Sequence, residues 1–165
     1  MAAIPIAPEP LVIPQLRDLV ASLAADPRTW SHLVRHDPTQ RVFERLIDEP
    51  EVEAWLICWM PGHDTGFHDH DLSSGAVTVV SGAVCEERLG LGRTCSNVYV
   101  PGDTFDFTAS EIHRVTHSGA AAAVTLHAYS PRLRRMGAYA VASDGALKRH
   151  PLGYGEELRP FEVLT

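Results

Sequence analysis

The 165-residue sequence predicts an all-β fold, a small barrel or sandwich with short helices at its N-terminal end. Between residues 41 and 129, segments of strand length that alternate or run apolar are separated by Gly, Pro, Asp and Ser. No long helical pattern lies between them, as a parallel α/β sheet would require. We therefore expect one domain over residues 15–165, preceded by an extended arm over residues 1–14.

The N-terminal region carries the only helical patterns. Four prolines in residues 1–14 favour an extended arm. From Gln15 onward, leucine and valine recur at helical spacing, and Asp26-Pro27 ends that predicted helix. A second short helix is predicted over residues 30–35.

Eight strands are predicted after Pro38. They span residues 41–48, 51–60, 76–80, 83–89, 96–100, 104–107, 113–117 and 122–129. Many short strands at regular spacing are typical of a barrel or sandwich, and a small barrel can hold one small ligand. The remaining residues, 132–165, mix Arg, Gly and Pro with short apolar pieces, and we expect them to wrap around the barrel.

Composition restricts the partners. The net charge of −7 argues against a surface for nucleic acid or anionic membranes, and no apolar run approaches the roughly 20 residues of a membrane span. Three cysteines form no CxxC pair, and the N-terminus lacks the pattern of a signal peptide. We expect a cytoplasmic protein whose partners are small molecules or a second copy, in a homodimer that the proline-rich arm could bridge.

Three histidines suggest a metal site. His68 and His70 are two residues apart, so in an extended stretch both imidazoles point the same way and can meet one metal ion. His113 begins a later predicted strand and offers a third nitrogen. His32 and His36 lie at helical spacing, but no acidic residue accompanies them as in HExxH, so we expect exposed helix residues there.

A set of neutral ligands bears on the chemistry. Three imidazoles leave the full charge of a divalent metal available to an anionic substrate, whereas a carboxylate ligand would cancel part of it. A thiol with a pKa near about 8.5 becomes a thiolate when it binds such a metal. Three histidines with an open position are also a zinc pattern, so spacing leaves iron and zinc as alternatives.

The spacing of these residues resembles the two motifs of the cupin superfamily. The first motif is matched by Gly62, His68, His70 and Gly82, and the second by Pro101, Gly102 and His113. Where most cupins carry a ligand glutamate, this chain has Ser74 and Gly75. The resemblance implies a small cupin-type β-barrel, or jelly roll, with a metal site that lacks a carboxylate ligand.

A closer resemblance is to the cysteine dioxygenase family of cupins. The matching pieces are LICWMPG at 56–62, HDH at 68–70, IHRV at 112–115 and TLHAYSP at 125–131. The resemblance implies that the three histidines bind Fe(II), and that Thr125, His127 and Tyr129 correspond to the family's Ser-His-Tyr series. Their spacing of two residues places all three on one face of a strand, as a hydrogen-bonded relay requires.

Two further positions follow from this resemblance. Mammalian members carry a cysteine that cross-links to the tyrosine; the matching position here is Gly75, so Tyr129 should remain a free phenol, as in bacterial members. The family's carboxylate-binding arginine lies two residues after an aromatic one, which makes Arg45, after Phe43, the candidate clamp. Arg41 points to the same strand face and stays an alternative.

The function that these features favour is an iron-dependent thiol dioxygenase that oxidises L-cysteine with O2 to cysteine sulfinate. Its partners would be a small thiol and O2. One alternative is the same chemistry on another small thiol such as 3-mercaptopropionate. Another is a non-catalytic cupin that binds a metal or small molecule.

Overall fold

A computed structural model describes residues 9–90, 93–153 and 155–160. One α-helix, α1 (Ile13–Ala25), and two 3-10 turns, η1 (Pro27–Thr29) and η2 (Ser31–Leu33), precede the strands. The strands are β1 (Val42–Asp48), β2 (Glu53–Trp59), β3 (His68–Asp69), β4 (Ser74–Ser81), β5 (Ala83–Gly90), β6 (Arg93–Tyr99), β7 (Thr104–Phe107), β8 (His113–Ser118), β9 (Ala123–Ser130), β10 (Arg135–Val141) and β11 (Leu147–Gly153).

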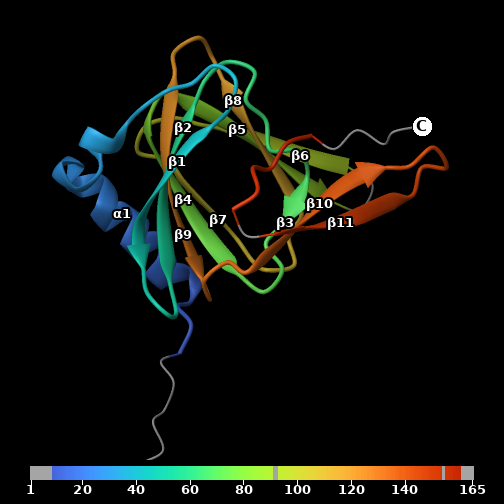
Figure 1. Cartoon of the computed structure of the whole chain (residues 1–165), viewed down its shortest axis with the longest axis horizontal. Coiled ribbons are helices and arrows are strands. Elements are labelled where there is room, and N and C mark those ends of the chain that lie inside the picture. The colour runs from blue at the N-terminus through green and yellow to red at the C-terminus, as the bar shows by residue number, and fades with distance from the viewer. Residues whose placement is uncertain (1–8, 91–92, 154, 161–165) are drawn as a thin grey trace, which may run out of the picture.

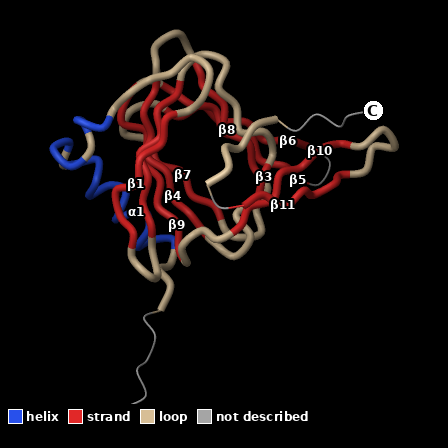
Figure 2. The backbone as a smooth tube through the Cα atoms, in the orientation of Figure 1, coloured by secondary structure: helices blue, strands red, loops and turns tan. Residues whose placement is uncertain are grey.

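Two antiparallel sheets form the body of the molecule, and the all-β prediction is confirmed. One has the order β1-β2-β9-β4-β7 and the other β11-β10-β3-β8-β5-β6. The strands curl around a shared interior, from which the β10–β11 hairpin projects sideways (Figures 1 and 2). Buried side chains of both sheets meet in that interior, among them Trp59, Val77, Phe105 and Val115.

The eight predicted strands are all present within a few residues. β3 was not predicted because its two residues are too short for a recognisable pattern, although it carries His68. The tail was expected to wrap around the barrel; instead β10 and β11 form a hairpin that extends the second sheet through β3. The six residues 155–160 then return toward the barrel (Figure 1).

The helical region differs from expectation in two places. α1 begins at Ile13, inside the predicted arm, because Pro14 lies in the first turn, where its missing N–H is not needed. The Gln15 side chain accepts a hydrogen bond from the Val12 amide at 2.9 Å and so caps this end. Residues 30–35 form no second α-helix, since η2 covers only Ser31–Leu33. Residues 1–8 of the arm lie outside the described part.

α1 and the turns after it cover the outer face of the first sheet. Leu16 and Val20 are fully buried against Ala76 of β4 and Ala128 of β9. Burial of side chains of this size contributes roughly 1.5–3 kcal/mol each. Since β9 is covered outside and faces the core inside, all eight of its residues are buried. Within the described ranges, we find no helix with the length and apolar character needed to cross a membrane.

Candidate active site

The three predicted histidines meet between the sheets. His68 of β3 lies directly opposite His113 of β8 in the sheet register, which places their ring centroids 4.7 Å apart. His70 follows β3, and its ring lies 4.8 Å from that of His68. One ligand nitrogen from each ring lies within 4.8 Å of the others, and the three side chains are only 2–3% exposed. We call His68, His70 and His113 the metal triad.

Hydrogen bonds orient two of these rings. The Nδ1 of His68 bonds the Gly66 carbonyl at 3.0 Å, and the Nδ1 of His113 bonds the Glu86 carboxylate at 2.8 Å. Each ring therefore presents Nε2 as its free ligand atom, with its tautomer set by the outer partner. The Nδ1 of His70 is buried and finds no hydrogen-bond partner among the described residues. Such a set of oriented imidazoles fits a divalent metal ion.

The environment of the metal triad keeps two of its imidazoles unprotonated. Burial, reinforced by the neighbouring imidazoles, lowers the pKa of His68 and of His70 well below the ordinary value. These two rings are therefore neutral at neutral pH, as metal ligands must be.

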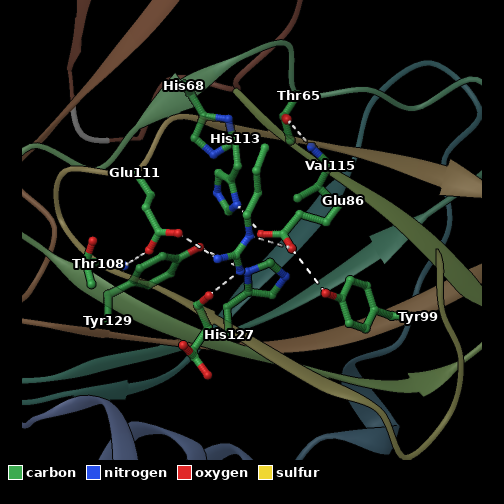
Figure 3. Close-up of polar contacts among 12 residues, drawn as sticks. Thr65, His68, Glu86, Tyr99, Thr108, Glu111, His113, Val115, His127 and Tyr129 are labelled. Carbon is green, nitrogen blue, oxygen red and sulfur yellow. Dashed lines mark hydrogen bonds and ion pairs between the residues drawn. The ribbon is translucent and has the colours of Figure 1, made fainter. Parts of the chain in front are cut away.

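Glu86 is the principal residue that the sequence interpretation missed. Its carboxylate is fully buried and also receives hydrogen bonds from the Arg88 Nε at 3.1 Å and the Tyr99 hydroxyl at 3.3 Å (Figure 3). Burial opposes ionisation, but the hydrogen bonds from His113 and Arg88 outweigh it and lower the pKa of Glu86. Among the residues that the structure describes, the group of candidate ligands contains no carboxylate, but one carboxylate lies directly behind a ligand. The sequence did contain a signal for this role: Glu86 lies two residues after Val84, so an acidic side chain shares the inward face of the predicted strand.

Asp69, between the two histidines of the motif, anchors the short strand β3. It points away from the metal triad and accepts hydrogen bonds from the Tyr139 hydroxyl at 2.6 Å and from Arg149 at 2.6 and 2.8 Å. Burial would raise the pKa of Asp69, but these donors hold it at about 2. The β10–β11 hairpin therefore positions the histidine motif from behind, a role that no local pattern indicated.

Gly75 lies at the expected place beside the tyrosine. It is the register partner of Tyr129 across the β4–β9 pair. A Cβ at this position would lie 2.2 Å from the Phe107 ring, so the ring fills the space that a side chain here would need. Phe107 in turn stacks on His70, with centroids 4.4 Å apart. A cysteine–tyrosine cross-link at this position is excluded, because residue 75 has no side chain.

The predicted relay is present on the inner face of β9. The Thr125 hydroxyl lies 2.7 Å from the His127 Nε2. The His127 Nδ1 lies 3.0 Å from the Tyr129 hydroxyl, and Figure 3 shows these two side chains. Burial, with repulsion from His113 and Arg41, lowers the pKa of His127 to about 3, so its ring carries a single N–H. Burial, with the charge of Glu53, raises the pKa of Tyr129 above its ordinary value, so the phenol keeps its proton.

Trp59 sets the direction of this relay. Its Nε1–H can only donate, and it donates to the Thr125 oxygen at 2.8 Å. The best acceptor for the Thr125 hydrogen is then the His127 Nε2, since the Ile57 carbonyl is at 3.5 Å. His127 consequently donates from Nδ1 to Tyr129, which leaves the phenol hydrogen free to point into the adjoining cavity.

That cavity lies between His68 of the metal triad and the relay. Its volume is about 110 Å³. His68, His127 and Tyr129 line it, together with apolar side chains such as Ile57, Leu133 and Met136. A space of this size, lined mainly by apolar side chains, accepts a small molecule.

The two candidate arginines occupy different places. Arg41 is 7% exposed, lines the cavity, and lies over the Trp59 ring with its guanidinium carbon 5.2 Å from the ring centroid. Arg45 does not line the cavity; it forms an ion pair with Asp48 at 3.2 Å and lies over Trp55. Of the two, the structure brings only Arg41 to the site.

Solved structures with the same architecture belong to other proteins of low sequence identity. A Thermus thermophilus protein matches with a TM-score of 0.56 and 20% identity, over 62% of this chain and 93% of its own. A Klebsiella pneumoniae protein with a double-stranded β-helix domain matches with a TM-score of 0.53 and 18% identity, over 61% of this chain and 80% of its own. A cupin superfamily protein of Desulfitobacterium hafniense matches with a TM-score of 0.53 and 14% identity, over 63% of this chain and 89% of its own. These similarities identify the fold as the double-stranded β-helix of cupins.

The family model described as cysteine dioxygenase type I matches residues 11–142. This range contains the metal triad, Glu86, the relay and both arginines, and it ends within the β10–β11 hairpin. The chain belongs to the cysteine dioxygenase type I family.

Proposed function

We propose that this protein is an iron-dependent thiol dioxygenase that converts L-cysteine and O2 to cysteine sulfinate, with both oxygen atoms transferred to sulfur. The observation that carries this proposal is the shared cavity, which His68 of the metal triad, Tyr129 and Arg41 line together around a space for one small molecule. A site that only bound a metal would have no use for the relay behind Tyr129.

Each residue has a role in this proposal. His68, His70 and His113 would hold Fe(II), which when bound supplies the redox chemistry that lets O2 react with a thiolate. Arg41 would bind the substrate carboxylate, since a guanidinium matches its two oxygens. Tyr129, with its free hydrogen directed into the cavity, would donate a hydrogen bond to the reacting atoms as negative charge develops there. The apolar lining limits the water that could compete.

Metal analysis followed by oxygen uptake tests the proposal. The purified protein is analysed for bound metal, loaded anaerobically with Fe(II), and mixed with L-cysteine, 3-mercaptopropionate or cysteamine. We expect one O2 consumed per thiol and a product that has gained two oxygen atoms, as mass spectrometry would show. No O2 consumption with any of the thiols, or zinc held so tightly that iron cannot replace it, would favour a binding protein instead.

A matched pair of variants tests the assignment of the clamp. Arg41→Gln removes the cavity guanidinium, and Arg45→Gln removes the same charge from further along β1. We expect Arg41→Gln to raise the KM for carboxylated thiols by roughly 10–100-fold, the cost of a charged hydrogen bond. Arg45→Gln should leave it nearly unchanged, and the reverse result would transfer the role to Arg45.

A further inference from the structure

The segment after β11 forms one wall of the cavity. Residues 155–158 line it together with Arg41, and in Figure 1 this segment (red) runs from the hairpin back toward the barrel. Pro160 packs against Gly66, where a Cβ would lie 2.8 Å from the Pro160 Cα. Gly66 also provides the carbonyl that orients His68, so the segment is anchored next to the metal triad.

Arg41 holds this segment in place. Its backbone N–H donates to the Glu157 Oε1 at 2.9 Å, and its Nη2 donates to the Leu158 carbonyl. The Arg41 Nη2 lies 3.7 Å from the Glu157 Oε1, and the other oxygen of Glu157 accepts from Arg159 at 2.6 and 3.0 Å. Glu157 is therefore held in a fixed position with its charge beside that of Arg41.

The charges on this wall do not suit a simple carboxylate. Excluding histidines, the charged side chains that line the cavity within the described ranges are Arg41, Glu156 and Glu157, which we call the charged wall. Burial opposes ionisation of Glu157, but its hydrogen bonds from Arg41 and Arg159 outweigh this and lower its pKa, so it is charged at neutral pH. A carboxylated thiol that approaches Arg41 also approaches an existing carboxylate.

We propose that Glu157 determines substrate class: together with Arg41 it selects a thiol that carries an ammonium group beside its carboxylate. Arg41 binds the carboxylate and Glu157 attracts the ammonium, so a zwitterion satisfies both charges. A thiol with only a carboxylate meets repulsion from Glu157, and one with only an ammonium leaves Arg41 without a ligand. This inference rests on the proposed function for the identity of the ligand as a thiol.

The source of this selectivity lies outside the family match. That match ends at residue 142, whereas Glu157 follows β11. Selection for the ammonium group would thus depend on a segment beyond the matched range, whereas the metal triad and the relay lie within it.

Anaerobic binding measurements test the inference independently of turnover. The iron-loaded protein is titrated by calorimetry with L-cysteine, 3-mercaptopropionate and cysteamine, for wild type, Glu157→Gln and a control, Glu49→Gln, which removes an exposed carboxylate at the β1–β2 turn. Wild type should bind L-cysteine most tightly. Glu157→Gln should reduce the preference for L-cysteine over 3-mercaptopropionate by roughly tenfold, the effect of one charged hydrogen bond, and Glu49→Gln should leave it unchanged.

Two results would overturn the inference. One is a wild-type protein that binds 3-mercaptopropionate as tightly as L-cysteine, a comparison that needs no variant to fold. The other is an unchanged preference in a Glu157→Gln protein whose melting temperature matches wild type. If selective binding is observed but no thiol consumes O2, the proposed function fails while the role of Glu157 stands.

Discussion

His68 of the metal triad lines the same cavity as the charged wall, but the triad and the wall are built differently. The triad comes from the paired strands β3 and β8 and from the residue that follows β3. Its side chains are 2–3% exposed, and buried hydrogen bonds anchor the rings of His68 and His113. The charged wall combines Arg41, just before β1, with a C-terminal segment that has no strand partner, and Glu156 on it is exposed. The sheet thus holds the candidate metal ligands, whereas the charged wall depends on polar bonds between distant parts of the chain.

Removal of a triad ligand should have the largest effect. His113→Ala is expected to abolish stoichiometric metal binding and to lower activity by more than the roughly 10–100-fold that loss of an outer partner causes. Metal content per chain and oxygen uptake measure both effects. His117→Ala, four residues along on β8, is the control and should retain its metal. A His113→Ala protein with full metal content would remove His113 from the triad.

The relay lies between the two regions and should affect turnover alone. Tyr129→Phe removes the hydroxyl that faces the cavity, and we expect kcat to fall by roughly 100-fold, as for loss of one positioned donor. Metal content and the affinity for L-cysteine should stay close to wild type, because neither the triad nor the charged wall has changed. Equal losses in affinity and kcat would indicate a substrate-binding role for the phenol instead.

Glu86 tests how far the triad depends on its surroundings. Glu86→Gln keeps the shape but removes the charge behind His113, and the metal affinity should fall by roughly 10–100-fold. Competition with a metal chelator measures this affinity without reference to activity. Glu87→Gln, on the adjacent residue that bonds Arg114 instead, is the matched control. Similar affinities for the two variants would make Glu86 a packing residue only.

The buried histidines should also make stability depend on pH, in the window where carboxylates do not titrate. His68, His70 and His127 have lowered pKa values in the folded, metal-free protein, whereas in the unfolded chain they take up protons below about pH 6.5. Their contribution is therefore fully present above that pH. It falls as the pH decreases, by about 1.4 kcal/mol per pH unit for each histidine.

Urea unfolding of metal-free protein at about pH 7.5, 6.5 and 5.5, on both sides of the ordinary histidine pKa, measures this dependence. Below about pH 6.5, His127→Gln should reduce the slope of the unfolding free energy against pH by the amount that corresponds to one proton, relative to wild type. Glu157→Gln should leave the dependence of the unfolding free energy on pH unchanged in this window. Because the pKa of Glu157 is lowered, its stabilising contribution is lost only below the ordinary carboxylate pKa of about 4.3. A slope that His127→Gln does not alter would mean that this ring is protonated in the folded state.

Much of the fold and of the chemical site could be predicted because strands have a period of two. That period places His68 with His70, and Thr125 with His127 and Tyr129, on common faces, and both groupings are present in the structure. The same period identified the β-strands, from alternating apolar residues in segments separated by Gly, Pro, Asp and Ser. It failed at β3, which is held by Asp69 contacts to the distant β10–β11 hairpin rather than by any pattern of its own.

The sequence by itself determined the ligand types, the relay order and the absence of a side chain at Gly75, because these depend on residue identity and on spacing within one strand. Only the tertiary structure distinguished Arg41 from Arg45, which share a strand face, because the cavity reaches one end of that face and not the other. The same holds for Glu86 and Glu157. Each acts through a partner far away in sequence, at 27 positions for Glu86 with His113 and 116 for Glu157 with Arg41, and local periodicity carries no information over such separations.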